Sequence, residues 1–211
     1  MFQPKHLTEA QRTALREQRK KDLDTVREFV EHSARISSVE FSDPSVWESM
    51  EIKRHLEIAE ILLLDAHQLN PVGLINSDLT GRRNNWFRTG RDAAAKKIPH
   101  GSHVRQLVAE LDAEIKSGVE RLKANPEAER AALAQYAHDM LLCISPFWEM
   151  NSRTARLFLN HTRKMLNLPI LVIKYEESGE YLARFEAFQQ TVFLPKYGAL
   201  IEQPRPLQPV V

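Results

Sequence analysis

Helical periodicity of the apolar residues is the feature that most restricts the fold of this chain. Apolar side chains recur three and four positions apart, and long runs that alternate apolar with polar residues are absent. Glycine is scarce, with 7 residues in a chain of 211. Because a half-buried strand would alternate at every second residue, this pattern predicts an all-α fold.

Six helices are expected from the apolar spacing and from residues that favour helix ends. The clearest starts are Asp43-Pro44 and Asn125-Pro126, where a capping residue precedes a proline in the first turn. The clearest ends precede Pro146 and Pro169, because proline disfavours helical geometry at the residue before it. The expected helices span residues 8–32, 43–68, 102–123, 126–144, 151–168 and 180–190.

Residues 70–100 depart from this pattern. Their centre, residues 82–88, is basic and aromatic. On both sides of it lie helix-breaking residues, namely Pro71, Gly73, Gly81, Gly90 and Pro99. This composition predicts a long surface loop or a small hairpin. A proline-rich, flexible tail is expected at residues 203–211. The whole chain, residues 1–211, is predicted to form one domain.

Charge and hydropathy restrict the class of partner. The 29 basic and 28 acidic residues give a formal net charge of +1, which argues against bulk electrostatic binding to nucleic acid or to a membrane. The longest unbroken apolar run, Met140–Ile144, is too short to cross a bilayer. The first residues lack the apolar core of a signal peptide. A cytoplasmic protein is the simplest expectation, and export without a cleaved peptide stays open.

Most of the chemical information lies in the predicted turn Ser145-Pro-Phe-Trp-Glu-Met-Asn-Ser-Arg-Thr-Ala-Arg156. Arg153 and Arg156 share one face of the helix that begins there, where each cation opposes the helix dipole by about 0.3–1 kcal/mol unless compensated. A helix N-terminus beside two guanidinium groups favours an anion such as phosphate. Glu149 could hold Mg²⁺ against that phosphate. From the spacing alone, a surface ion-pair cluster is the alternative.

The same turn resembles the signature of the Fic family, His-Pro-Phe-x-Asp/Glu-Gly-Asn-Gly-Arg-x-x-Arg. The positions that match are Pro146, Phe147, Glu149, Asn151, Arg153 and Arg156. Three positions differ, because Ser145 replaces the histidine and Met150 and Ser152 replace the two glycines. The resemblance covers residues 62–187, after N-terminal helices at residues 8–68. It implies an all-α, Fic-like helical domain with a small β-hairpin flap at residues 81–99.

Most members of this family transfer AMP from ATP to a hydroxyl group of a target protein. The resemblance implies that the motif histidine acts as general base, that Glu149 binds Mg²⁺, and that the phosphates are contacted by Asn151, Ser152, Arg153 and Arg156. Ser145 cannot accept the proton, because a serine hydroxyl itself needs a base at neutral pH. Loss of a general base lowers a rate by about 10²–10⁴-fold. We therefore expect weak binding of ATP and Mg²⁺ with little or no AMP transfer.

The resemblance also implies two regulatory or docking features. The flap would dock an acceptor protein by backbone pairing, through Arg83, Asn85, Trp86 and Phe87. Many members carry an inhibitory motif, Ser/Thr-x-x-x-Glu-Gly/Asn, whose glutamate pairs with the second motif arginine. Ile36-Ser-Ser-Val-Glu40-Phe41 resembles it imperfectly and would pair Glu40 with Arg156. An ordinary loop before a helix is the alternative for this segment.

Three functions follow from these observations. The first is a degenerate relative of the protein adenylyltransferases that keeps a phosphate-binding loop. The second is a non-enzymatic regulator that binds proteins and is built on a Fic fold. The third is an active nucleotidyltransferase with an unusual base, for which His138 and His161 flank the site in sequence. A protein partner or target is expected in each case.

Overall fold

The computed structural model describes residues 9–41, 43–81, 87–89 and 97–201. Within these ranges the chain contains no strand, and one isolated antiparallel bridge joins Phe87 to Phe147. The α-helices are α1 (Glu9–Ile36), α2 (Met50–Glu60), α3 (Val72–Thr80), α4 (Gly101–Leu122), α5 (Glu127–Ile144), α6 (Asn151–Met165), α7 (Ser178–Phe188) and α8 (Leu194–Tyr197). Short 3₁₀ or π turns occupy Pro44–Glu48, Ile61–Asp65, Tyr175–Glu177, Gln189–Phe193 and Gly198–Leu200. The predicted all-α fold is confirmed.

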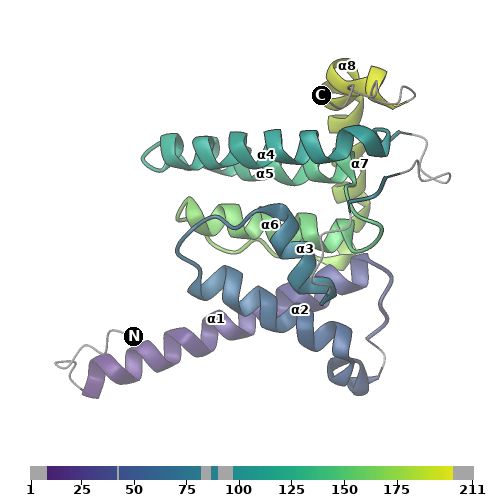
Figure 1. The fold of residues 1–211 in the computed structure, drawn as a ribbon. Helices are drawn as coiled ribbons and strands as arrows, with labels where there is room; N and C mark the ends of the chain where they lie inside the picture. The colour runs from purple at the N-terminus through teal and green to yellow at the C-terminus, as the bar shows by residue number, and fades with distance from the viewer. Residues whose placement is uncertain (1–8, 42, 82–86, 90–96, 202–211) are drawn as a thin grey trace, which may run out of the picture.

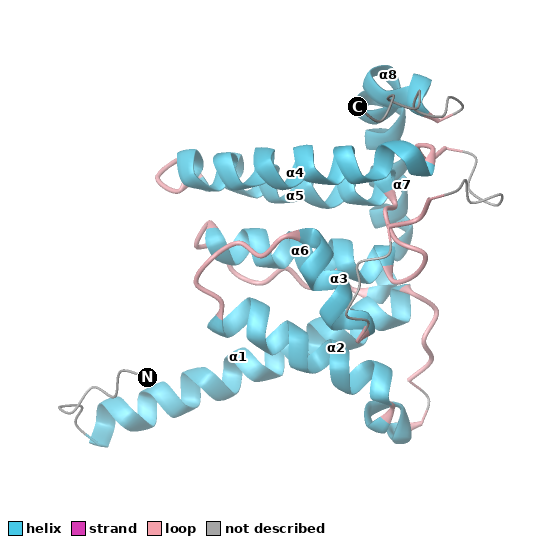
Figure 2. Ribbon diagram, in the orientation of Figure 1, coloured by secondary structure: helices cyan, strands magenta, loops and turns pink. Residues whose placement is uncertain are grey.

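The helices form stacked layers around α6 (Figure 1, Figure 2). Helices α4 and α5 lie side by side in one layer, and α6 packs beneath α5 with α3 beside it. Helices α1 and α2 pack together on the opposite side, while α7 runs across one end of the layers. Residues 153–162 of α6 are all buried, so α6 is the central helix of the fold.

Polar side chains of α6 anchor the connections that surround it. The Asn160 carboxamide donates to the Leu171 carbonyl at 3.0 Å and accepts from the Leu171 N–H at 2.7 Å. His161 Nε2 accepts from the Asn70 N–H at 2.8 Å, and its Nδ1 lies 3.2 Å from the Leu62 carbonyl. Both ring nitrogens of His161 therefore have structural partners, as expected for a buried polar group.

The expected helix at residues 43–68 is divided into three pieces. Asp43 caps as predicted, accepting from the Ser45 N–H at 2.8 Å, but it starts the 3₁₀ turn Pro44–Glu48. Ser49 then adopts an extended conformation and caps α2, with its Oγ 3.4 Å from the Ile52 nitrogen. The prediction of one helix was wrong because Ser49 acts as a second N-cap, which interrupts the helical conformation and begins a new helix.

The loop expected at residues 70–100 contains a helix, α3, which the sequence analysis missed. Pro71 stands at its N-cap, and Gly81 ends it with a φ of 68°. A left-handed C-cap favours glycine, so these two residues mark the ends of a nine-residue helix and not a continuous loop. The expected hairpin flap falls largely on residues 82–86 and 90–96, outside the described ranges.

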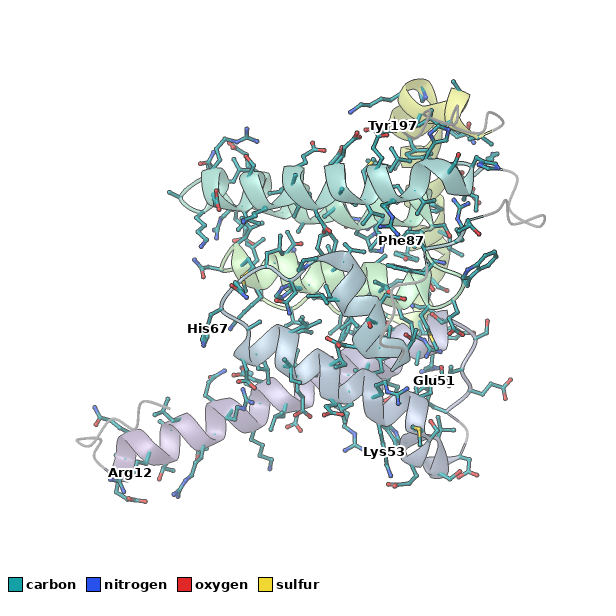
Figure 3. The ribbon with its side chains drawn as sticks, viewed as in Figure 1. Arg12, Glu51, Lys53, His67, Phe87 and Tyr197 are labelled. Atoms are coloured by element: carbon teal, nitrogen blue, oxygen red, sulfur yellow. The ribbon has the colours of Figure 1, made fainter. Side chains whose placement is uncertain are left out.

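The N-terminal half of α1 extends away from the layered body (Figure 1). Its residues 9–21 are exposed, and polar side chains such as Arg12 point into solvent (Figure 3). None of the helices in the described ranges combines the length and the apolar character that a membrane span requires. The tail predicted at residues 203–211 lies outside the described residues.

Candidate anion site at the N-terminus of helix α6

The turn between α5 and α6 is closed by Asn151. Its Oδ1 accepts from the Phe147 N–H at 2.9 Å, and its Nδ2 donates to the Phe147 carbonyl at 2.7 Å. The Thr154 N–H then donates to the Met150 carbonyl at 2.8 Å, which begins α6. Asn151, for which phosphate contact was predicted, thus holds the shape of the turn in this structure.

Two residues of the turn adopt left-handed backbone conformations. Ser145 has a φ of 45° at the end of α5, and Met150 has a φ of 61° just before α6. Each such conformation costs a residue other than glycine about 1–2 kcal/mol. Met150 stands where the family signature has glycine, so the backbone explains the preference for glycine there.

One buried arginine that the sequence analysis missed fixes the other side of the turn. Arg88 is 2% exposed, and its guanidinium donates to the carbonyls of Ser145 at 2.7 Å, Ile144 at 3.0 Å and Pro99 at 2.6 Å. Its backbone N–H donates to the Pro146 carbonyl at 2.9 Å. A cation at these carbonyls also compensates the dipole at the C-terminus of α5.

Phe87 is the one predicted docking residue that lies within the described ranges. Its ring stacks on that of Phe147, with centroids 5.5 Å apart, and it is partly buried. The other three predicted docking residues, Arg83, Asn85 and Trp86, lie outside the described residues. Phe87 therefore packs against the turn of the candidate site, and the docking role stays a prediction.

Arg156 is buried on the inner face of α6 and is held mainly by α1. Its Nε donates to Ser33 Oγ at 2.9 Å, and its Nη2 donates to the Ser33 carbonyl and to Ser37 Oγ, both at 2.6 Å. Its Nη1 donates to the Tyr181 hydroxyl at 3.4 Å. Burial lowers the pKa of Arg156, but a guanidinium group stays protonated in proteins.

Arg153 is also buried, with 4% of its surface exposed, and it forms an ion pair with Glu51 of α2. Its Nε has no hydrogen-bond partner among the described residues. Burial and the charges of Arg153 and Arg156 together lower the pKa of His55 to about 3. Both guanidinium charges therefore disfavour a proton on His55.

A hollow of about 280 Å³ opens beside Arg153. It is lined by Ser37, Ser38, Met150, Ser152 and Arg153. Ser152, one of the predicted phosphate ligands, lies 3.2 Å from Ser37 across this hollow, hydroxyl to hydroxyl. Small-molecule sites usually measure about 300–1,000 Å³, so this hollow suits a phosphate group better than a whole nucleotide.

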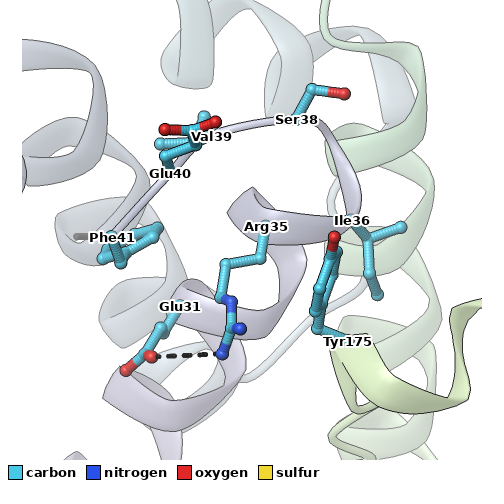
Figure 4. Close-up of a pocket in the computed structure, with 8 residues that line it drawn as sticks. All are labelled: Glu31, Arg35, Ile36, Ser38, Val39, Glu40, Phe41 and Tyr175. Atoms are coloured by element: carbon cyan, nitrogen blue, oxygen red, sulfur yellow. Dashed lines mark ion pairs between the residues drawn. The ribbon is translucent and has the colours of Figure 1, made fainter.

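Glu40 is not brought to Arg156. It is exposed on the loop after α1, where it lines a larger hollow of about 710 Å³ with Arg35 and Tyr175 (Figure 4). The guanidinium of Arg156 donates hydrogen bonds to Ser33 and Ser37 instead. Ser33 and Ser37 have the same four-residue spacing as the first and fifth positions of the inhibitory motif, three residues before the predicted segment. Ser38, which follows them, has a left-handed backbone conformation.

Glu149 is exposed at the turn, and its backbone carbonyl accepts from Asn76 at 3.3 Å. The described residues contain no group of three or more His, Cys, Asp or Glu side chains that could hold a metal ion. Mg²⁺ usually binds proteins through one or two carboxylates together with substrate phosphates and water. Glu149 alone therefore suits a metal that arrives with a phosphate ligand.

Comparisons with known proteins agree with this architecture, although no protein-family model and no curated protein matches the sequence. A Fic-domain-containing signaling protein from Bacteroides thetaiotaomicron matches with a TM-score of 0.65 at 16% identity, over 81% of this chain and 74% of that one. Fic-1 from C. elegans matches with a TM-score of 0.61 at 17% identity, over 87% of this chain and 62% of that one. A variant of Fic-1 matches with 0.62 at 18% identity, over 87% and 61%. The chain therefore has the fold of Fic-domain proteins.

Proposed function

We propose that this protein is a degenerate relative of the Fic-fold adenylyltransferases, which binds a phosphate group weakly at the N-terminus of α6 and transfers little or no AMP. The observation that carries the proposal is the position of two buried arginines, Arg153 and Arg156, within the first two turns of that helix. A helix N-terminus and two guanidinium groups on one side form a favourable environment for a phosphate.

Weak binding follows from the contacts that the two arginines already make. A phosphate that approaches Arg153 competes with the Glu51 carboxylate for its guanidinium group. Arg156 has its donors directed to Ser33, Ser37 and Tyr181, so it would contribute mainly through its charge. Met150 adds a long side chain at the edge of the same hollow.

Loss of transfer activity follows from Ser145. Catalysis at this position needs a group that accepts the proton of the attacking hydroxyl, and a neutral serine cannot do so. The two nearby histidines are engaged elsewhere: His161 with Asn70 and Leu62, and His138 with Asp139 and Tyr181. Neither has a free ring nitrogen for this task.

Two assays test the proposal. Thermal unfolding with ATP, ADP or inorganic phosphate, with and without Mg²⁺, should show stabilisation that grows with ligand, by about 2.7 kcal/mol at a hundredfold excess over Kd. Incubation with labelled ATP and cell extract should leave the wild-type protein without transfer activity, and the double change Ser145→His with Met150→Gly should restore some. Robust transfer by the wild-type protein would refute the proposal.

A protein-binding regulator is the second candidate function, and one observation favours it. Trp148, at the tip of the same turn, is 58% exposed. Tryptophan is enriched at the centres of protein interfaces, so an exposed one is a candidate anchor for a partner. The change Trp148→Ala should abolish capture of a partner protein without affecting thermal stabilisation by ATP.

A further inference from the structure

Arg156 raises a question of charge compensation. Its side chain is 1% exposed, and none of the ion pairs among the described residues includes it. The groups that contact it, Ser33, Ser37 and Tyr181, are all neutral. A buried charge is costly unless it is compensated, so the counter-ion has to act through intermediate groups.

A continuous path of short contacts leads from Arg156 to a buried carboxylate. Arg156 Nη1 lies 3.4 Å from the Tyr181 hydroxyl, which lies 3.1 Å from His138 Nε2. His138 Nδ1 lies 2.7 Å from Asp139 Oδ1. The exposed fractions of Tyr181, His138 and Asp139 are 5%, 0% and 2%, so the path is shielded from water. It connects α6, α7 and α5.

The positions of the protons along this path can be assigned from the contacts. A distance of 2.7 Å between Nδ1 and a carboxylate oxygen requires a proton between them, so Nδ1 donates to Asp139. Burial lowers the pKa of His138, which keeps the ring neutral and leaves a lone pair on Nε2. Nε2 therefore accepts from the Tyr181 hydroxyl, whose oxygen accepts in turn from Arg156.

Every bond in the resulting chain points in the same direction, from the cation to the anion. Hydrogen bonds aligned in this way polarise one another, and the effect is larger away from water. The chain also fixes the orientation of the guanidinium, because Nη1 is the one nitrogen of Arg156 that α1 does not contact. The network therefore both compensates the charge of Arg156 and fixes the orientation of its guanidinium group.

We propose that Asp139 is the counter-ion of Arg156, acting through His138 and Tyr181, and that these three side chains are positioning residues of the anion site. The positioning role rests on the proposed function, because it concerns the positive charge that Arg156 contributes beneath the anion site. The charge relationship does not depend on any ligand. It makes α7 part of the site, although α7 is distant from the turn in sequence.

Arg184 is the competing partner of Asp139. Its Nη2 lies 4.0 Å from Asp139 Oδ1, and its side chain is 45% exposed. A direct but exposed ion pair contributes little to stability, whereas a shielded pair is sensitive to the loss of either partner. The two arginines therefore provide a matched comparison for the origin of the compensating charge.

Two double-mutant cycles, measured by urea unfolding without ligand, separate these possibilities. The first combines Asp139→Asn with Arg156→Met, and the second combines Asp139→Asn with Arg184→Met. In the wild type, Asp139→Asn should destabilise the protein and so raise the equilibrium constant for unfolding. We expect this rise to be smaller by at least about tenfold in the Arg156→Met background. We expect the Arg184 cycle to be additive within error. Coupling to Arg184 alone would overturn the proposal.

Side-chain ¹⁵N NMR of the wild-type protein provides a test that survives poor folding of a variant. His138 should keep its proton on Nδ1 and stay neutral at pH 7, and Tyr181→Phe should shift only the Nε2 resonance toward that of an unbonded nitrogen. A proton on Nε2, or a charged ring, would contradict the chain.

Phosphate binding then tests the positioning role separately. Tyr181→Phe should weaken the binding of inorganic phosphate several-fold, and Tyr136→Phe, which removes a hydroxyl bound to Glu114, should leave it unchanged. Equal affinities for Tyr181→Phe and the wild type would overturn the positioning role. If the wild type binds no phosphate, the proposed function fails, while the two cycles still decide whether Asp139 compensates Arg156.

Discussion

The Glu51 carboxylate forms an ion pair with the buried guanidinium of Arg153. This contact joins α2 to the first turn of α6 and occupies the arginine that faces the hollow. The carboxylate is an internal anion at the place where we propose that a phosphate binds. Stability and ligand binding should therefore change in opposite directions when Glu51 is altered.

The change Glu51→Gln should strengthen phosphate binding and weaken the free protein. The amide removes the competing charge, so the Kd for ATP should fall. Loss of the ion pair should lower the free energy of unfolding by about 1 kcal/mol, because a buried donor keeps only a weaker acceptor. Thermal unfolding with and without ATP measures both effects.

Glu48→Gln is the matched control, since Glu48 forms an exposed ion pair with Lys53 at 2.5 Å, away from Arg153. It should leave both quantities unchanged. An unaltered ATP affinity in Glu51→Gln would show that the carboxylate does not compete with the ligand.

Ser38→Gly should stabilise the protein. Ser38 has a φ of 67° and an exposed side chain, so glycine relieves about 1–2 kcal/mol of backbone strain and loses about 0.5–1 kcal/mol through the entropy of the unfolded chain. The expected gain is about 0.5–1 kcal/mol in urea unfolding. Ser117→Gly, at an exposed position inside α4, should instead destabilise by about 0.5 kcal/mol. Changes of the same sign at both positions would argue against strain at Ser38.

Asn151→Ala should destabilise the turn by about 1–3 kcal/mol, because both backbone groups of Phe147 lose their partner. Asn151→Asp keeps an acceptor for the Phe147 N–H but not a donor for its carbonyl, so its cost should be intermediate. The urea midpoint measures this order. Equal stability of all three proteins would remove the structural role that we assign to Asn151.

His55 should make stability depend on pH. Its pKa is lowered to about 3 in the folded protein, mainly by burial, so the folded state resists a proton that the unfolded state takes up below about pH 6.5. The contribution of neutral His55 to the free energy of unfolding is fully present above that pH. It is lost as the pH falls toward 3, by roughly 1 kcal/mol per pH unit.

The change His55→Phe should reduce the slope of stability against pH in this window. Burial also lowers the pKa of His138 and His161, so part of the slope should persist. His67→Phe, at an exposed position, is the control and should leave the slope unaltered. An unchanged slope in His55→Phe would contradict the burial of a neutral imidazole at this position.

The helices that carry the site were predictable because local signals mark their ends. Pro126, Pro146 and the apolar spacing placed α4, α5 and α6 within a few residues of their observed bounds. Helix α3 was missed because Pro71 and Gly81 were interpreted as loop residues, whereas they flank a short helix. Local signals identify a boundary, but they do not state on which side of it the helix lies.

The contacts that control the two arginines were not predictable in this way. Ser33 and Arg156 are 123 positions apart, and Glu51 and Arg153 are 102 positions apart. A serine on a helix carries no sign of such a partner, so Glu40 was selected instead, because residues 36–41 resemble the inhibitory motif. Pairing across this distance depends on how α1 and α2 pack against α6, which periodicity does not specify.

The most direct test of the central claim is a calorimetric titration of the ligand-free protein with ATP and Mg²⁺. The account predicts weak, saturable binding that Arg153→Ala abolishes and that Arg121→Ala, at an exposed position of α4, leaves intact. Absence of binding to the wild type, or binding that persists unchanged in Arg153→Ala, would contradict it.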